Sequence, residues 1–185
     1  FDFDRLMESR LDNSFLQLTT LMSLERDLNL RGGLPPTRGW AASPDFLAHA
    51  YRLAVTDGVK VVVECSSGTS TVILARAMQQ QGSGHVHSLE HDPIFANLTR
   101  AHLLRLGLQD FATVIDAPLV EHSLAGELWD WYAMADVPDD IDLLVIDGPP
   151  GRPGKLARYP AIPLLKSRLL PSTRVILDDA DRPEE

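Results

Sequence analysis

The chain contains 185 residues, of which 44% are hydrophobic and 23% charged, and its formal net charge is −9 at pH 7. This length fits a single domain with a sizeable core. The acidic balance and scattered basic residues argue against nucleic acid as the main partner, because phosphate neutralisation needs clustered Lys and Arg. No apolar run approaches the ~20 residues that span a bilayer, which argues against a membrane protein.

Cys65 is the only cysteine, which excludes an internal disulfide and a multi-cysteine zinc site and fits a reducing compartment. We therefore expect a cytoplasmic protein. The chain begins at Phe1 rather than at an initiator Met, and FDFD is not typical of a signal peptide, so we expect a trimmed N-terminus.

Apolar residues recur at helical spacing over positions 5 to 30, which predicts one or two amphipathic helices. These helices could pack on the main body or on a second subunit, so a homodimer through them is one hypothesis. A loop is expected over 31–36, and a further helix is expected from Ser43 as N-cap to about residue 57. We interpret the chain as one domain with three parts: a helical extension (1–34), a cap segment with a helix (35–58) and an α/β core (59–185).

Strand and helix signals alternate from residue 59 onward. Strands are predicted at about 61–64, 85–90, 113–116, 141–147 and 174–178, and helices at about 70–81, 92–107 and 156–169. The segment 118–140 fits either a helix or a hairpin lying over the sheet. Apolar strands with helices between them predict an α/β fold with a doubly wound, mostly parallel sheet that is covered on both faces. The closing strands of such a sheet are expected to lie outside this chain.

The turn after the first strand indicates which class of ligand the fold binds. A dinucleotide site uses three glycines there, whereas this turn has Gly68 with Ser66 and Ser70 at the alternate positions. Glu64, at the end of the strand, would repel a diphosphate and suits a ligand with a cationic end. Glu90 lies 22 residues after Gly68, where such folds place a carboxylate that accepts from ribose hydroxyls. Together these features indicate a nucleoside joined to an amino acid, which describes S-adenosylmethionine (SAM).

Several segments resemble the class I SAM-dependent methyltransferases, in particular a small bacterial-type branch. The resemblance is carried by ECSSGTST (64–71), SLEHDP (88–93), IDLLVIDGPPG (141–151) and LLPSTRVILDDADR (169–182), and it implies a Rossmann-like methyltransferase fold. Ser66 departs from the family, because a glycine usually stands there. The resemblance implies the following cofactor-binding residues: Glu64, Ser66, Ser67, Gly68 and Ser70 at the methionine end, Glu90 and His91 near the ribose, Asp116 and Ala117 at the adenine, Asp147 beside the methyl group, and Trp40 and Ser43 in a cap.

Asp147, Asp178 and Asp179 end two strands that are expected to be neighbours. An oxygen-only set of this kind suits Mg²⁺ or another divalent cation, although the two aspartates after the last strand could equally form a solvated cap. Without a metal, Asp147 is the candidate catalytic residue that orients or deprotonates an acceptor. Arg158, in the loop region that follows, could contact an anionic acceptor or lie in solvent.

These features favour an enzyme, a SAM-dependent methyltransferase that transfers a methyl group in line to the oxygen or nitrogen of a small molecule. Alternatives are a non-catalytic SAM-binding interaction module, an aminopropyl transferase that uses decarboxylated SAM, and an NAD(P)-binding oxidoreductase. The oxidoreductase is disfavoured by the missing glycines and by Glu64.

Overall fold

The computed structural model describes residues 3–37, 39, 41–56, 58–151 and 156–180. Its centre is a sheet of five strands in the order β3-β2-β1-β6-β7, with every neighbouring pair parallel. The strands are β1 (Val61–Cys65), β2 (His85–Glu90), β3 (Ala112–Asp116), β6 (Ile141–Ile146) and β7 (Leu169–Leu177). The predicted doubly wound, mostly parallel α/β fold is confirmed.

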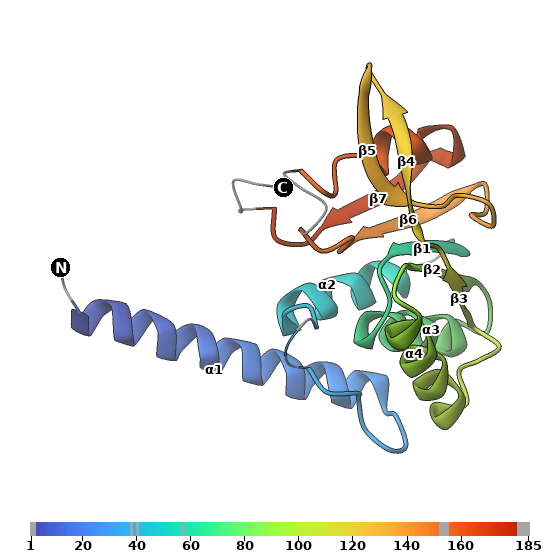
Figure 1. The fold of residues 1–185 in the computed structure, drawn as a ribbon. Coiled ribbons are helices and arrows are strands. Elements are labelled where there is room, and N and C mark those ends of the chain that lie inside the picture. The colour runs from blue at the N-terminus through green and yellow to red at the C-terminus, as the bar shows by residue number, and fades with distance from the viewer. Residues whose placement is uncertain (1–2, 38, 40, 57, 152–155, 181–185) are drawn as a thin grey trace.

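One face of the sheet is covered by three helices, α2 (Pro44–Ala54), α3 (Thr69–Gln81) and α4 (Pro93–Leu106) (Figure 1). The sequence fixes where α4 begins and ends. Asp92 is its N-cap and accepts from the backbone N–H of Ile94, while Pro93 supplies a helical φ at the first position. Gly107 ends α4 in the left-handed region at φ +67°.

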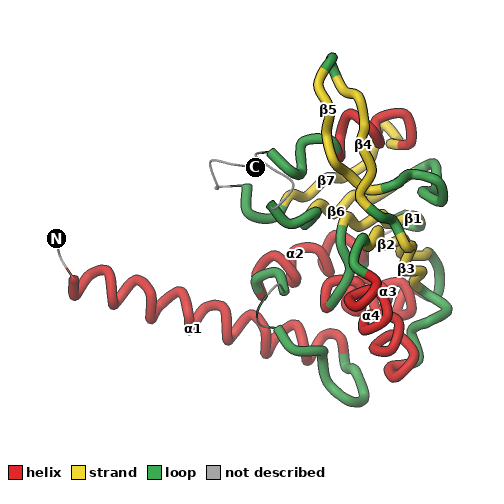
Figure 2. The backbone as a smooth tube through the Cα atoms, in the orientation of Figure 1, coloured by secondary structure: helices red, strands yellow, loops and turns green. Residues whose placement is uncertain are grey.

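The other face carries an antiparallel hairpin and a short helix. The hairpin consists of β4 (Leu119–Leu124) and β5 (Glu127–Tyr132), and it rises from the sheet in Figure 2. Trp131 and Tyr132 at its base are completely buried against the sheet. Of the two interpretations of residues 118–140, the hairpin is therefore correct.

The helix predicted over 156–169 is wrong in its extent. The structure has only α5 (Ala161–Leu165) and a 3₁₀ turn, η1 (Lys166–Arg168), after a run of turns. Pro163 explains the difference. In a helix that began at 156 this proline would stand in the interior, where it removes a hydrogen bond and clashes with the preceding turn. In a helix that begins at Ala161 it stands in the first turn, where both effects vanish.

The N-terminal extension is a single helix, α1 (Phe3–Leu28). Its last turns pack on the body, where Leu24 and Leu28 are buried with Leu47 of α2 and Ile73 of α3. Its first turns extend away from the body (Figure 1). None of the helices in the described part of the chain combines the length and the apolar character needed to cross a membrane.

Candidate functional site

The strand order places a crevice at the centre of the sheet. The chain winds from β1 outward through β2 to β3, then returns to β6 on the other side of β1, so the connections after β1 and β6 diverge. Ligands of open α/β sheets bind at such a switch point, beyond the carboxyl ends of the strands. A cavity of about 510 Å³ lies there. It is lined by residues that follow the strands and by residues of neighbouring loops and α4: Ser66, Ser67, Glu90, His91, Asp147, Asp178 and Asp179, with Gly39, Ala41, Ala42, Ser43, Asp92, Phe95, Pro150, Gly151 and Arg158.

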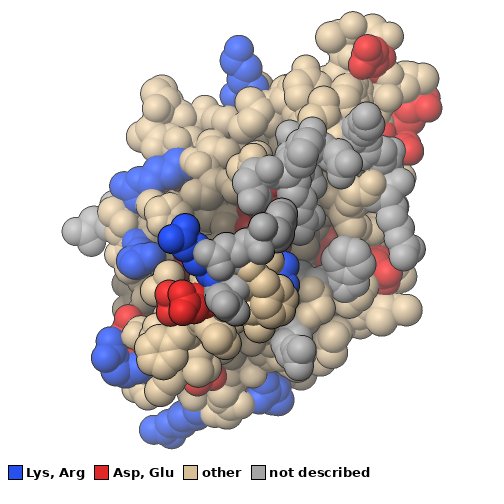
Figure 3. Space-filling view, turned by 90° about the vertical axis from the view of Figure 1, so that its left-hand side faces the viewer, with Lys and Arg blue, Asp and Glu red and all other residues tan. Residues whose placement is uncertain are grey.

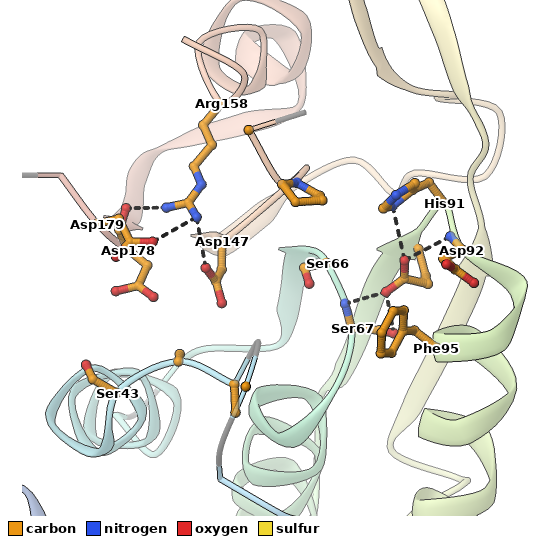
Figure 4. Close-up of a pocket in the computed structure, with 16 residues that line it drawn as sticks. Ser43, Ser66, Ser67, His91, Asp92, Phe95, Asp147, Arg158, Asp178 and Asp179 are labelled. Atoms are coloured by element: carbon orange, nitrogen blue, oxygen red, sulfur yellow. Dashed lines mark hydrogen bonds and ion pairs between the residues drawn. The ribbon is translucent and has the colours of Figure 1, made fainter. Parts of the chain in front are cut away.

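Glu90 forms one end of this cavity and is only 4% exposed. Its Oε2 accepts from the backbone N–H of Ser67 at 3.1 Å and from the Ser67 hydroxyl at 2.8 Å, and its Oε1 accepts from the backbone N–H of Asp92 at 3.0 Å. His91 places its Nδ1 3.2 Å from Oε1, and the ring of Phe95 stands beside Ser67 (Figure 4). The carboxylate is therefore held in one orientation next to an aromatic wall.

The opposite end of the cavity is acidic. Carboxylate oxygens of Asp147, Asp178 and Asp179 lie within 4.8 Å of one another. Arg158 reaches into this cluster, with its Nη2 3.2 Å from Oδ1 of Asp147 and 3.1 Å from Oδ2 of Asp179 (Figure 4). Burial, and then the neighbouring charge of Asp178, raise the pKa of Asp147 to about 8, although Arg158 opposes this shift.

The turn between β1 and α3 lies between the Glu90 end and the acidic end of the cavity. Ser66 adopts φ +117°, a conformation that L-residues with a Cβ rarely occupy, and Gly68 adopts φ +155°. The turn leads into the N-terminus of α3, where the backbone N–H groups and the helix dipole favour an anionic ligand group. Ser43, the N-cap residue of α2, faces the turn across the cavity (Figure 4).

The structure does not bring Glu64 to the cavity. Glu64 is completely buried, and its Oε2 accepts from the hydroxyls of Thr71 at 2.6 Å and Ser88 at 2.7 Å. Burial raises the pKa of its carboxyl group, while nearby hydroxyls lower it. In the described residues this carboxyl group ties β1 to β2 and α3, because it lies on the face of β1 that packs against α3. Its expected contact with the methionine end stays a prediction.

Other expected residues also lie outside the cavity lining. Gly68 and Ser70 belong to the turn and the start of α3 but do not line the cavity. The side chain of Asp116 is 68% exposed and pairs with Arg100 at 2.7 Å, while Ala117 is completely buried in the core. Trp40 lies outside the described residues.

Among the lining residues outside the expected set, Phe95 and Arg158 bring side chains that the proposed chemistry uses. Phe95 was not expected, but its position in the sequence could have identified it as a lining residue. It stands in the first turn of a helix whose N-cap, Asp92, comes two residues after the end of β2, so that turn must face the same edge of the sheet. Arg158 lines the cavity with a side chain that is 6% exposed, so the solvated alternative for it is wrong.

A parallel sheet in this order, with Glu90 at the end of β2 and Asp147 after β6 facing one cavity, is the arrangement of a Rossmann-like nucleotide-binding fold. The family comparison identifies the class within this fold, because residues 63–180 match the family model described as "Methyltransferase domain". The chain belongs to this methyltransferase family.

Solved structures with the same fold include a methyltransferase from Geobacter sulfurreducens, with a TM-score of 0.59, 18% identity and coverage of 94% of this chain and 79% of that one. A precorrin-6y C5,15-methyltransferase from Geobacter metallireducens has a TM-score of 0.55 and 18% identity, and the match covers 78% of this chain but 66% of that protein. An RNA methyltransferase from Salinibacter ruber, in complex with S-adenosyl-L-homocysteine, has a TM-score of 0.50 and 18% identity, with 76% and 75% covered. No curated protein matches the chain.

Proposed function

We propose that the chain binds SAM in the cavity at the switch point and methylates an oxygen or nitrogen of a small molecule. The observation that carries this proposal is the separation of two chemically different ends within one cavity. Glu90, an oriented and buried acceptor, stands at one end, and Asp147, with its raised pKa, stands at the other. A nucleoside joined to a cationic amino-acid end has this same polarity.

The residues present fit the cofactor. A carboxylate offers about four acceptor positions, and hydrogen bonds from Ser67 and Asp92 use three of those of Glu90. The remaining capacity, together with the adjustable hydroxyl of Ser67, suits the two hydroxyls of a ribose. Phe95 offers an apolar surface to the base. The N-terminus of α3 would hold the amino-acid carboxylate, and the acidic end would receive the cationic groups. When bound, SAM supplies a methyl group on a positively charged sulfur.

Asp147 is the residue proposed to act on the acceptor. A general base works best when its pKa lies near the working pH, and the pKa of Asp147 is raised to about 8. An approaching cationic sulfonium favours the ionised form. The carboxylate then takes the proton of the acceptor O–H or N–H while the acceptor's electron pair forms the new bond to the methyl carbon. The electron pair of the broken carbon–sulfur bond stays on sulfur, so the by-product is neutral at that atom.

Small molecules are favoured over nucleic acid as acceptors. The chain carries a net charge of −9. On the face shown in Figure 3, Lys and Arg side chains are interspersed with Asp and Glu and form no continuous basic stripe. A phosphate backbone needs such a stripe. The RNA methyltransferase among the proteins of this fold makes RNA the contrasting acceptor to test.

The acidic end does not fit a divalent cation as it is arranged. The three carboxylates are close enough to share one ion, but Nη2 of Arg158 lies between two of them, 3.2 Å from Asp147 and 3.1 Å from Asp179. A cation would have to displace a guanidinium whose side chain is 6% exposed. The reaction proposed here therefore uses no metal ion.

Cofactor binding is tested by calorimetric titration with S-adenosylhomocysteine, with NADH as the control ligand. We expect micromolar-range binding that Glu90→Ala weakens about tenfold or more, because the buried carboxylate proposed to accept from the ribose is lost. Asp116→Ala is the matched control, since its exposed carboxylate ends the next strand. Equal losses in the two variants, or binding of NADH, would contradict the assignment of the site.

Turnover is tested by transfer of labelled methyl groups to separate pools of hydroxylic or amine small molecules and of RNA. Asp147→Asn should abolish most of the transfer, since it removes the base, and leave S-adenosylhomocysteine binding within a few-fold. Labelling of RNA alone would overturn the small-molecule assignment. Binding of the cofactor without transfer to any pool would instead favour a non-catalytic SAM-binding module.

A further inference from the structure

The feature that the cofactor site leaves unexplained is the surface of α1. Met7, Leu11, Phe15, Leu18 and Met22 are spaced by four, four, three and four residues, so they form one stripe along a helix. In the described part of the chain nothing covers them, and their exposed fractions run from 40% to 68%. Five large apolar side chains aligned on one exposed face mark an interaction surface rather than scattered surface residues.

The stripe is separate from the contact between α1 and the body. Leu24 and Leu28 make that contact and are buried, and they lie about a third of a turn around the helix from the stripe. Every residue of α1 from position 5 to 16 is exposed, and this half of the helix extends beyond the rest of the molecule (Figure 1). The stripe is therefore exposed and takes no part in the contact between α1 and the body.

We propose that the stripe binds the same stripe of a second copy, with the two α1 helices antiparallel around a two-fold axis. The spacing suits this partner, because its central part reads 4-3-4 in either direction. An antiparallel register places Phe15 on Leu18 of the other copy and Leu11 on Met22 of the other copy. The two-fold axis repeats each contact, as in other isologous dimers.

The charges beside the stripe and the apolar area of the stripe also favour a second copy of the chain as the partner. Glu8 and Arg26 border the same side of the stripe, at opposite ends, and the antiparallel register brings Glu8 of each copy beside Arg26 of the other. The stripe has five large side chains, and half-exposed residues of this size offer roughly 100 Å² each. A pair of stripes would bury roughly 1,000 Å², about the area that a specific interface needs.

The test is the mass of the full chain in solution, measured by sedimentation over about 1 to 100 µM. We expect the wild type to be a dimer and Leu18→Glu to be a monomer at every concentration. Leu16→Glu is the matched control: Leu16 is 58% exposed against 54% for Leu18, but it lies on the opposite side of α1. Circular dichroism shows whether each variant keeps its helices. A monomeric wild type, or equal effects of the two substitutions, would overturn the proposal.

The register is tested separately by a disulfide. Leu11→Cys with Met22→Cys in one chain should give a covalent dimer upon mild oxidation, because these positions face each other across the two-fold axis. Native Cys65 is completely buried, and burial raises the pKa of its thiol, so it does not contribute. The pair Leu16→Cys with Met22→Cys should stay monomeric on a denaturing gel. Equal cross-linking of both pairs would overturn the antiparallel register.

Discussion

Ser66 occupies a backbone conformation that residues with a Cβ atom disfavour. It adopts φ +117° in the turn that connects β1 to α3, where the family resemblance leads one to expect glycine. A Cβ in this region costs about 1–3 kcal/mol. No hydrogen bond of its side chain is among the described contacts, so the turn gains no such compensation from the hydroxyl.

We therefore expect Ser66→Gly to raise the free energy of unfolding by about 1 kcal/mol. The measurement is urea denaturation of the cofactor-free protein. Ser66→Ala serves as the control, because it removes the hydroxyl but keeps the Cβ, and it should leave stability nearly unchanged. A gain in Ser66→Ala that equals the gain in Ser66→Gly would show that the hydroxyl, and not the backbone, causes the cost.

Arg158 supports a second prediction at this scale. Its guanidinium occupies the position between Asp147 and Asp179 that a shared cation would need. Mg²⁺ should therefore leave the thermal midpoint of the wild type unchanged. Arg158→Gln leaves three carboxylates close together, so this variant should be less stable and should regain about 1–2 kcal/mol at millimolar Mg²⁺.

Differential scanning fluorimetry with Mg²⁺ or with EDTA measures this effect. Arg100→Gln is the control, because Arg100 also pairs with an aspartate but does so at an exposed site. Stabilisation of the wild type by Mg²⁺ would show that the cation enters without the loss of Arg158.

Two acidic residues show what the sequence could and could not predict about the site. Glu64 and Glu90 both end strands, and both were expected in the cavity. The structure places Glu90 in the lining and buries Glu64 against α3. Strand alternation does not separate the two, since Glu64 shares a face with Val62 and Glu90 shares one with Val86, and both valines lie in the core beneath the helices. The register separates them: Glu64 pairs with Ser88, so Glu90 lies two residues further toward the edge of the sheet where the cavity is. A strand register is tertiary information that one strand of sequence does not contain.

At the scale of elements, the β4–β5 hairpin takes the place that a helix has on the other face of the sheet. Its base is buried through Trp131 and Tyr132, while Leu128 near its tip is 66% exposed. The hairpin therefore contributes to the core through one end only. Its two strands pair with each other and do not join the main sheet.

Trp131→Ala should therefore lower the free energy of unfolding by about 3–5 kcal/mol, the cost of removing a large buried aromatic side chain. Leu128→Ala, three residues earlier on the same strand, should change it by less than about 0.5 kcal/mol. Chemical denaturation followed by circular dichroism compares the two. A small effect of Trp131→Ala would mean that the hairpin contributes little to the stability of the sheet.

Local signals placed most elements well because the caps are explicit. Asp92, Pro93 and Gly107 mark both ends of α4 in the sequence and in the structure. The segment 156–169 lacked such signals, and its helical pattern was overridden by the geometry of Pro163. Residues 118–140 were ambiguous because the pattern of their aromatic residues does not distinguish a helix from a hairpin. The contact of Trp131 and Tyr132 with the sheet resolves this ambiguity, and that contact is tertiary.

For the whole molecule, the balance of buried titratable groups determines how stability depends on pH. Burial raises the pKa of Asp147 to about 8. The folded chain therefore holds a proton that the unfolded chain releases above its ordinary pKa near 3.8, and stability falls as pH rises through this range. Burial raises the pKa of Asp178 in the same direction. It also lowers the pKa of His87 from 6.5 to about 4, which has the opposite sign and acts only below pH 6.5.

These opposing contributions determine how the free energy of unfolding of the cofactor-free protein varies with pH. Below about pH 6.5 the histidine effect offsets part of the carboxyl effect, so the free energy of unfolding should fall less steeply with pH there than above pH 6.5. Above that pH only the carboxyl effect remains, and the free energy should fall by roughly 2 kcal/mol by about pH 8.5, since one proton contributes about 1.4 kcal/mol per pH unit. Asp147→Asn carries no proton to lose and should remove most of this decline. Asp130→Asn, on the exposed side of β5, should retain it. Urea denaturation at a series of pH values measures the profile, and a decline of equal size in both variants would place the responsible group elsewhere.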